Sequence, residues 1–207
     1  MKKKGLNILA ILFVIILFII IFVLTFTLLM LYRNHTIIKR IQSEMSYYID
    51  NAMNDFHIKV EYKASSAFEE NDEFKYSTKD IYRKGFIVKS ISLNDDNTYV
   101  HYEDTSTEES YLFNIKENTK IGYGRSIIRE FLDFLDLYYA NMPRVKITVN
   151  DDYYIVKYPT SNYYFDKENY RIKKIEVFSD VKVWSETIYT YFDNEEITDE
   201  MVAMPEI

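Results

Sequence analysis

Residues 145–178 read VKITVNDDYYIVKYPTSNYYFDKENYRIKKIEVF. Short runs rich in Tyr, Ile and Val, which favour strands, alternate here with polar turns such as Asp166-Lys-Glu-Asn169. Runs joined by turns of a few residues predict neighbouring antiparallel strands. A shift in the alternation after Ile172 predicts a β-bulge at Lys173-Lys174. The segment therefore predicts a meander of antiparallel strands.

The same alternation of apolar and polar residues continues on both sides of this segment. Further runs of strand type stand at 57–63, 86–93, 98–103, 111–115 and 182–192. Together these runs predict about seven to nine antiparallel strands. Another stretch, residues 125–140, repeats apolar residues at helical steps and predicts one helix inserted between the strands. A single helix among many strands indicates an α+β fold rather than a parallel βαβ sheet.

A long apolar run opens the chain. Residues 8–31 (ILAILFVIILFIIIFVLTFTLLML) number 24, and their polar members are Thr25 and Thr27. As a helix they extend about 36 Å, enough to cross a hydrocarbon core of about 30 Å. A cleaved signal peptide has a shorter apolar region, of about 7–15 residues, and a small-residue cleavage site, which the following residues lack. We therefore predict an uncleaved transmembrane signal-anchor over residues 8–31.

Positive charges on the two sides of the predicted span indicate its orientation. Lys2–Lys4 and the free amine lie in the tail at residues 1–7, whereas Arg33, Lys39 and Arg40 follow the span. The positive-inside rule counts Lys and Arg near the span, and by that count the N-terminal side has a narrow excess. We predict a single-pass protein of the cell membrane, with a cytoplasmic N-terminus and an extracytoplasmic C-terminal domain.

The residues that follow the span have an amphipathic pattern. Over 32–56, apolar and aromatic residues recur at three- and four-residue steps, which predicts a helix with one apolar stripe. The pattern favours packing of this stripe on the domain behind it, and a short parallel coiled coil with a second copy is the alternative. Residues 57–207 are predicted to form one β-rich domain outside the cytoplasm.

Charge and cysteine content exclude several classes of protein. The net charge is −7, and beyond residue 40 there are 19 basic and 32 acidic residues. A nucleic-acid-binding protein needs clustered Lys and Arg to neutralise phosphates, so nucleic acid is not expected as a partner. The chain contains no Cys, which excludes disulfides, thiolate metal sites, a cysteine nucleophile and a lipid-modified cysteine.

Residues suited to catalysis do not form a recognisable motif. His35, His57 and His101 lack the spacing of metal ligands and are interpreted as solvated surface residues. Pairs such as Glu195-Glu196 stand in predicted loops and are interpreted as solvated charge. The sequence has no Gly-rich phosphate loop and no Gly-x-Ser-x-Gly motif. We therefore expect no enzyme activity, catalytic residue, metal or cofactor.

The last hairpins follow a distinctive order. Residues 163–178 form an aromatic strand, an Asp-x-Glu turn and a long strand, and they are followed by Thr187–Asp193 and by residues 197–206. In this order the end of the chain resembles the LolA-type superfamily of lipoprotein carriers and lipoprotein-binding sensors. The resemblance implies a half-barrel-like, strongly curved antiparallel sheet covered by helices. It also implies that the concave apolar face holds acyl chains.

One face of the last long strand carries the candidate ligand-binding residues. Trp184, Ile188 and Phe192 share this face. Side chains of this kind line sites for apolar ligands, and packing into the core is the other interpretation.

Two functions stay open from the sequence. The first is a membrane-anchored extracytoplasmic module that binds a lipid, lipoprotein or other apolar ligand, which predicts an apolar cavity between sheet and helix. The second is a protein-interaction or scaffold domain of a cell-envelope membrane complex, which predicts a filled core and an exposed apolar patch. The expected partners are the membrane and a lipid, a lipoprotein or a membrane protein.

Overall fold

The computed structural model describes residues 2–51, 54–65, 74–94, 97–122, 126–127, 145–179 and 182–206. The chain divides into two compact units, Met1–Arg40 and Ile41–Ile207. Except for Ser126 and Ile127, the helix predicted at 125–140 lies outside the described residues.

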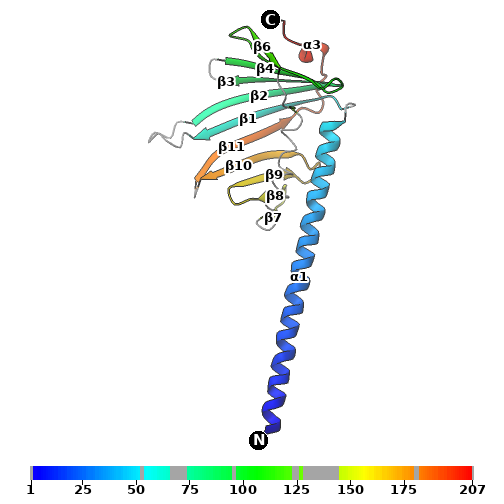
Figure 1. The fold of residues 1–207 in the computed structure, drawn as a ribbon, viewed down its shortest axis with the longest axis vertical. Helices are drawn as coiled ribbons and strands as arrows, with labels where there is room; N and C mark the ends of the chain where they lie inside the picture. The colour runs from blue at the N-terminus through cyan, green and yellow to red at the C-terminus, as the bar shows by residue number, and fades with distance from the viewer. Residues whose placement is uncertain are drawn as a thin grey trace. The chain divides into compact units, whose positions relative to one another are not determined.

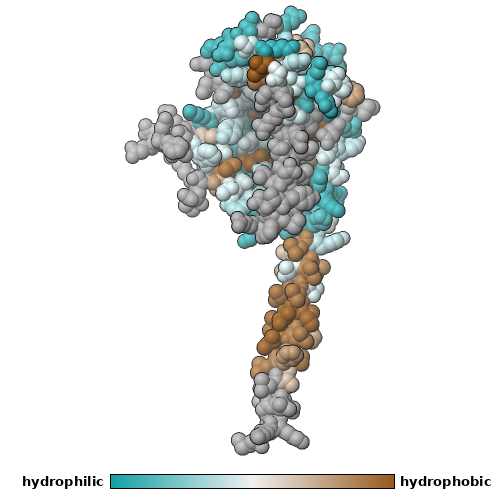
Figure 2. Space-filling view, viewed as in Figure 1, coloured by the Kyte–Doolittle hydropathy of each residue, from teal (hydrophilic) through white to brown (hydrophobic). Residues whose placement is uncertain are grey.

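The first unit is helical. Helix α1 (Lys2–Asp50) begins at the N-terminus (Figure 1) and provides all the described structure of this unit. Its apolar side chains from Ile11 to Leu31 are exposed and form the hydrophobic stretch of the helix in Figure 2. The Thr27 hydroxyl donates to the Val23 carbonyl oxygen at 2.8 Å, so its polar group is satisfied within the helix. This helix is long and apolar enough to cross a membrane.

Helix α1 ends at Asp50, so the helix predicted for residues 32–56 is too long at its C-terminal end. Asn54 donates its backbone N–H to the Asn51 carbonyl at 2.9 Å and its side-chain amide to the Tyr47 carbonyl at 3.2 Å. The amide thereby satisfies a carbonyl that the last turn of a helix leaves without a partner. Asn and Asp favour such turns over helix interiors, and Phe56 already belongs to the first strand.

An antiparallel sheet forms most of the second unit. Its eleven described strands follow the order β6-β5-β4-β3-β2-β1-β11-β10-β9-β8-β7, which can be traced in Figure 1. The predicted α+β class and curved antiparallel sheet are therefore confirmed. The strands are β1 (Phe56–Ser65), β2 (Phe74–Lys84), β3 (Ile87–Asn94), β4 (Asn97–Asp104), β5 (Glu109–Asn114), β6 (Thr119–Gly122), β7 (Lys146–Val149), β8 (Tyr153–Lys157), β9 (Ser161–Asp166), β10 (Ile172–Ser179) and β11 (Lys182–Tyr191).

The sheet consists of two meanders joined by its first and last strands. Strands β1 to β6 pair in chain order, and so do β7 to β11. Strand β1 then pairs with β11, with Ile58 opposite Tyr191 and Ala64 opposite Ser185. This long-range pairing makes one continuous sheet out of the two halves.

The predicted bulge in β10 is confirmed. Its register against β9 shifts between Ile172 and Lys174, and so places Lys173 at the extra position. A bulge bends its strand and increases the local twist, which contributes to the curvature of this half of the sheet.

Strands β2 and β6 are present although neither was predicted. In β2, the face that carries the apolar Ile81 also carries Lys75, Lys79 and Arg83. Apolar and polar residues therefore do not alternate along this strand, and it lacks the pattern from which strands were predicted. A two-residue loop, Gly85-Phe86, joins β2 to β3, and Gly85 has a φ of 57°. A positive φ at the first loop position suits the tight turns that connect paired strands, and glycine adopts it without strain.

The core lies on the face of the sheet that carries Ile58 and Ile81, here called the core face. Both side chains are buried. On the last turns of α1, Ile41, Met45 and Ile49 are also fully buried within the monomer. This spacing of four residues forms one stripe. The stripe thus packs into the domain, as the sequence favoured, rather than lying exposed for a coiled coil.

The opposite face, here called the polar face, carries a network of charged pairs. Lys59 lies 2.9 Å from Glu61, and Lys174 lies 2.7 Å from Glu176 and 3.4 Å from Glu186. The chain after β11 includes the short helix α3 (Asp199–Val202), which contacts β2 and β3. Val202 of this helix is buried.

Candidate functional site

An apolar groove of about 250 Å³ lies in the second unit, along strands β1 to β4 and β11. Its lining consists of Val60, Tyr62, Ser77, Thr78, Lys79, Ser92, Leu93, Tyr99 and Thr187. Residues opposite one another in paired strands share a face of the sheet. The register therefore places most of these side chains on the core face, where Val60 and Tyr62 follow buried Ile58 at two-residue steps.

The register also orders the residues across the groove. Val60 is opposite Lys79, Lys79 is opposite Ser92, and Ser92 is opposite Tyr99. One row therefore crosses four strands and changes from apolar on β1 to cationic and hydroxyl-bearing on β2 to β4. Tyr62 keeps 39% of its surface exposed, so its ring is accessible to a ligand.

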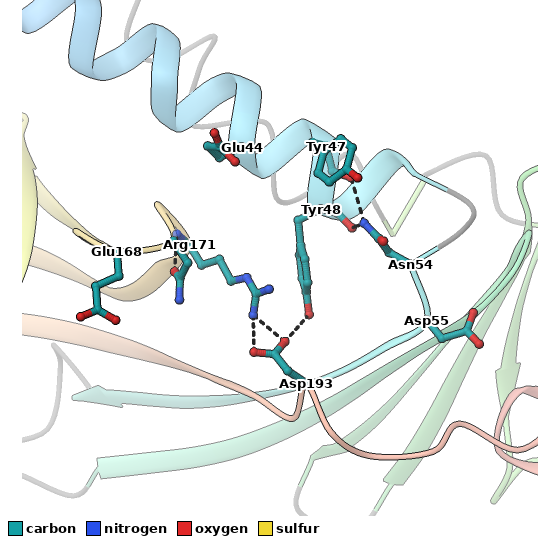
Figure 3. A pocket seen from close by; sticks show the side chains of 9 residues that line it. Glu44, Tyr47, Tyr48, Asn54, Asp55, Glu168, Arg171 and Asp193 are labelled. Atoms are coloured by element: carbon teal, nitrogen blue, oxygen red, sulfur yellow. Dashed lines mark hydrogen bonds and ion pairs between the residues drawn. The ribbon is translucent and has the colours of Figure 1, made fainter.

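A second concavity of the same unit is polar. It has a volume of about 560 Å³ and lies between the last turns of α1, the β9–β10 turn and the chain after β11 (Figure 3). Its lining consists of Glu44, Tyr47, Tyr48, Asn54, Asp55, Glu168, Asn169, Arg171 and Asp193. Four carboxylates therefore surround one guanidinium, and we name this concavity the acidic cleft.

Arg171 organises the floor of the acidic cleft. Its Nη1 donates to Asp193 Oδ2 at 2.6 Å, and the Tyr48 hydroxyl donates to Asp193 Oδ1 at 3.3 Å (Figure 3). The guanidinium carbon lies 3.8 Å from the centre of the Tyr48 ring and 5.2 Å from that of Tyr191. An ion pair combined with contacts to two aromatic rings holds Arg171 in one orientation.

The three residues proposed from the sequence as ligand-binding lie outside the groove lining. Trp184 and Ile188 lie on the polar face, where they are 41% and 40% exposed. Phe192 follows the end of β11, and its ring stacks on His57 at 4.5 Å between centroids. Ile188 is opposite Lys174 and Glu61, so charged residues flank it.

His57 and His101 are buried, which corrects their interpretation as solvated surface residues. His57 is 8% and His101 is 6% exposed. His101 Nε2 lies 2.7 Å from the Ser110 hydroxyl. His57 becomes buried because Tyr82 of β2 and Phe192, in the chain after β11, stack on its ring.

His57 is part of a cluster that includes Glu195, which is exposed outside the strands as predicted but whose carboxylate also contacts the His57 ring. Its Nδ1 lies 2.5 Å from Glu195 Oε2 and its Nε2 lies 2.8 Å from Asp80 Oδ1. Each ring nitrogen is therefore within hydrogen-bond distance of a carboxylate oxygen. The ring also lies between Tyr82, at 4.3 Å, and Phe192. This cluster fastens the chain after β11 to β1 and β2. Among the described residues, no group of His, Asp and Glu could hold a metal ion.

The stability of the domain is expected to depend on pH through the Tyr191 hydroxyl. Its hydroxyl donates to the Ile172 carbonyl at 2.9 Å, and burial raises the pKa of Tyr191 well above its ordinary value. Above about pH 10 the unfolded chain releases this proton while the folded chain retains it, so stability falls as pH rises. Tyr191→Phe is expected to lower the free energy of unfolding by about 1 kcal/mol at pH 7, through loss of the hydrogen bond.

Denaturant titrations at pH 7 and pH 10.5 measure both effects in the wild-type and Tyr191→Phe chains. The substituted chain is expected to lose less stability between the two pH values than the wild type. Equal losses would contradict the assignment of the alkaline instability to Tyr191.

Comparison with known proteins gives structural similarities only. No family model matches the chain, and no curated protein matches it. The chain is similar to a LolA superfamily protein from Nitrosomonas europaea, with a TM-score of 0.37 and 10% identity over 79% of this chain and 97% of the other. It is also similar to an outer membrane lipoprotein-sorting protein domain from Vibrio parahaemolyticus, with a TM-score of 0.35 and 10% identity over 77% and 93% of the two chains.

A third similar structure is MucB in complex with MucA(peri). The TM-score is 0.41 and the identity 10%, over 79% of this chain and 58% of MucB. The sheet described above is antiparallel, as the resemblance of the C-terminal hairpins implied.

Proposed function

We propose that this protein is a membrane-anchored extracytoplasmic module that binds a lipid, lipoprotein or other apolar ligand and catalyses no reaction. The observation that supports this function is the groove on the core face. The surface exposed in it is mainly apolar and includes Val60 and the accessible ring of Tyr62, although most of the lining residues also carry a hydroxyl or ammonium group. Sites for apolar ligands are concave and lined by such side chains, with few polar groups among them.

The membrane location in this proposal depends on helix α1. Its exposed apolar stretch from Ile11 to Leu31 suits a hydrocarbon environment. The excess of Lys at residues 2–4 favours a cytoplasmic N-terminus. The domain that contains the groove then lies outside the cytoplasm, where it can meet lipids or lipoproteins.

The volume of the groove limits what it can enclose. At about 250 Å³ it falls just below the range of about 300–1,000 Å³ that is typical of sites for drug-sized ligands. A section of one acyl chain fits this space better than a bulky ring system. The ligand is therefore expected to lie along the sheet with part of its length outside the groove.

Val60→Glu tests the proposed function, because it places a carboxylate in the apolar part of the groove. The added carboxylate faces Lys79 on the neighbouring strand, and together they replace the apolar surface beside a hydrocarbon chain with polar groups. The substitution is therefore expected to reduce lipid that co-purifies with the full chain at least about tenfold. Native mass spectrometry of the chain released from detergent measures this lipid. The difference from wild type isolates the groove, because α1 is the same in both chains.

Ile188→Glu is the matched control. It places the same carboxylate on the neighbouring strand but on the polar face, and Ile188 is one of the three residues that the sequence proposed for ligand binding, with Trp184 and Phe192. We expect this chain to retain wild-type lipid. Loss of lipid from Ile188→Glu but not from Val60→Glu would move the site to the polar face. Absence of bound lipid from the wild type would overturn the proposed function.

The acidic cleft favours a second function, that of a protein-interaction domain. Tyr47 is 67% exposed at its edge, and the cleft combines accessible aromatic surface with an excess of carboxylates. A basic side chain of a partner protein would meet complementary charge there.

A further inference from the structure

We infer that the part of α1 that follows its apolar stretch binds the phosphate groups of anionic lipids, through Arg33 and Lys39. This inference goes beyond the proposed function, because it assigns a class of lipid to the anchor rather than a ligand to the groove. It rests on the transmembrane placement of α1 within that proposal.

Residues 32–43 carry positive charge without negative charge. Arg33, Lys39 and Arg40 are the residues charged at pH 7 in this stretch, and the first acidic residue of the chain is Glu44. Beyond residue 40, by contrast, acidic residues outnumber basic ones by 32 to 19. The stretch next to the predicted span is therefore attracted to an anionic membrane surface, although the chain as a whole is acidic.

The side chains of Arg33 and Lys39 are exposed on the helix. In the part of the chain that the structure describes, neither side chain forms a hydrogen bond or an ion pair. Both charges are therefore accessible to a ligand. A guanidinium or ammonium group forms its strongest hydrogen bonds with a charged acceptor, such as the oxygens of a phosphate.

The helix sets the depth of both cations along its axis. Helix α1 continues from Lys2 to Asp50, and each residue of a helix advances it by about 1.5 Å, so Arg33 lies about 3 Å beyond Leu31 and Lys39 about 9 Å farther. The headgroup layer of a bilayer is about 5–8 Å thick on each side of the hydrocarbon core. Arg33 then lies within this layer, and the long side chain of Lys39 can extend back to it.

Tyr32 provides independent support for a headgroup layer at this position. It stands between the apolar stretch and Arg33, and 73% of its side chain is exposed. Tyrosine is enriched where the hydrocarbon core meets the headgroups, because its ring is apolar and its hydroxyl is polar. The order of apolar, aromatic and cationic residues along α1 therefore matches the order of the layers from the hydrocarbon core outward.

Competition between two lipids tests the inference. The full chain is placed in nanodiscs that contain equal amounts of phosphatidylglycerol, which is anionic, and phosphatidylcholine, which has no net charge. The reference chain carries Lys2→Gln, Lys3→Gln and Lys4→Gln, so that no lysine acts at the other end of the span. Native mass spectrometry measures the lipids that remain bound after release. The reference chain is expected to retain phosphatidylglycerol at least about fivefold in preference, the attraction of one cation near a membrane surface.

Arg33→Gln and Lys39→Gln together, in the reference chain, are expected to remove most of this preference. Arg33→Lys keeps the charge and is expected to keep the preference. Lys59→Gln removes a lysine from the polar face of the sheet and is expected to change nothing. The groove is the same in all these chains, so lipid bound there cancels in the comparison. A preference that survives the double substitution, or that Lys59→Gln removes, would overturn the role of Arg33 and Lys39.

The remaining outcomes separate the inference from the proposed function. Equal retention of the two lipids by the reference chain would overturn the preference for anionic lipid and leave the membrane anchor in place. A wild-type chain that stays in solution without detergent and does not enter nanodiscs would overturn the anchor and the inference together.

Discussion

Replacement of Arg83 by methionine is expected to lower the free energy of unfolding by about 2–4 kcal/mol. Arg83 is 1% exposed, and its side chain lies on the core face beside Phe56. Its Nε donates to the Gly85 carbonyl at 2.9 Å and its Nη1 donates to the Ile49 carbonyl. Methionine would fill much of the space but leave both carbonyls without this donor, at about 1–3 kcal/mol for each buried group.

The Ile49 carbonyl gives Arg83 a second role. It belongs to the last turn of α1, where carbonyls have no partner within the helix and the helix dipole favours a positive charge. Arg83 thus joins the end of the helix to strand β2. Denaturant titration followed by near-ultraviolet circular dichroism measures the effect on the packed domain.

Arg83→Lys is the control for charge. Lysine keeps the positive charge but cannot place two donors as the planar guanidinium does. Its loss of stability is expected to be about half that of Arg83→Met. A methionine chain as stable as the wild type would show that water or other groups satisfy the two carbonyls.

Replacement of His57 by leucine is the second substitution with a large expected effect, about 2–3 kcal/mol. His57 contacts Asp80 and Glu195, and both carboxylates are about one-third exposed or less. Removing the imidazole leaves the carboxylates of Asp80 and Glu195 without the ring whose two nitrogens they contact. It also removes a ring that stacks between Tyr82 and Phe192.

The effect of His57→Leu is expected to concentrate in the chain after β11. The Phe192 backbone N–H donates to the His57 carbonyl at 3.0 Å, and Glu195 reaches the His57 ring from the same segment. Hydrogen exchange of Phe192 and Ala203 should therefore increase more than that of Glu61 in the centre of β1. Uniform exchange across the three amides would contradict a local role for the cluster.

His57→Phe separates the contribution of ring stacking from that of the contacts to the two carboxylates. Phenylalanine keeps the aromatic stack and loses only the contacts to the carboxylates, so we expect it to recover about 1 kcal/mol relative to leucine. Asp80→Asn in the His57→Phe chain removes one of the two facing charges and is expected to restore further stability. No recovery in either chain would point to packing volume as the main contribution of His57.

Local sequence pattern was sufficient to predict the class of the fold. Alternating apolar residues predicted the meander from β7 to β11, and a single slip in that alternation predicted the bulge at Lys173. Both features depend on neighbours within one strand or one hairpin. Strand β2 escaped prediction because Lys79 and Arg83 interrupt its apolar face.

The candidate site could not be predicted from the same pattern. Trp184, Ile188 and Phe192 share a face of one strand, and that face is the charged one once Lys174 and Glu186 are placed beside them. A strand pattern states which residues share a face but not which face the core covers. Tyr62 and His57 lie on opposite faces of β1, yet the apolar ring is exposed and the histidine is buried. Their exposure depends on what packs against each face, which the pattern of one strand does not state.

The sequence by itself determined the long apolar helix, the antiparallel class of the sheet and most of its turns, because these depend on residues close together in the chain. The tertiary structure decided the pairing of β1 with β11 and the assembly of the groove from five strands. Those features depend on contacts between residues more than a hundred positions apart, such as Tyr62 and Thr187. Local periodicity carries no information about which strands pair and in which register. The sequence alone therefore did not predict that Val60, Lys79, Ser92 and Tyr99 form one row across four strands.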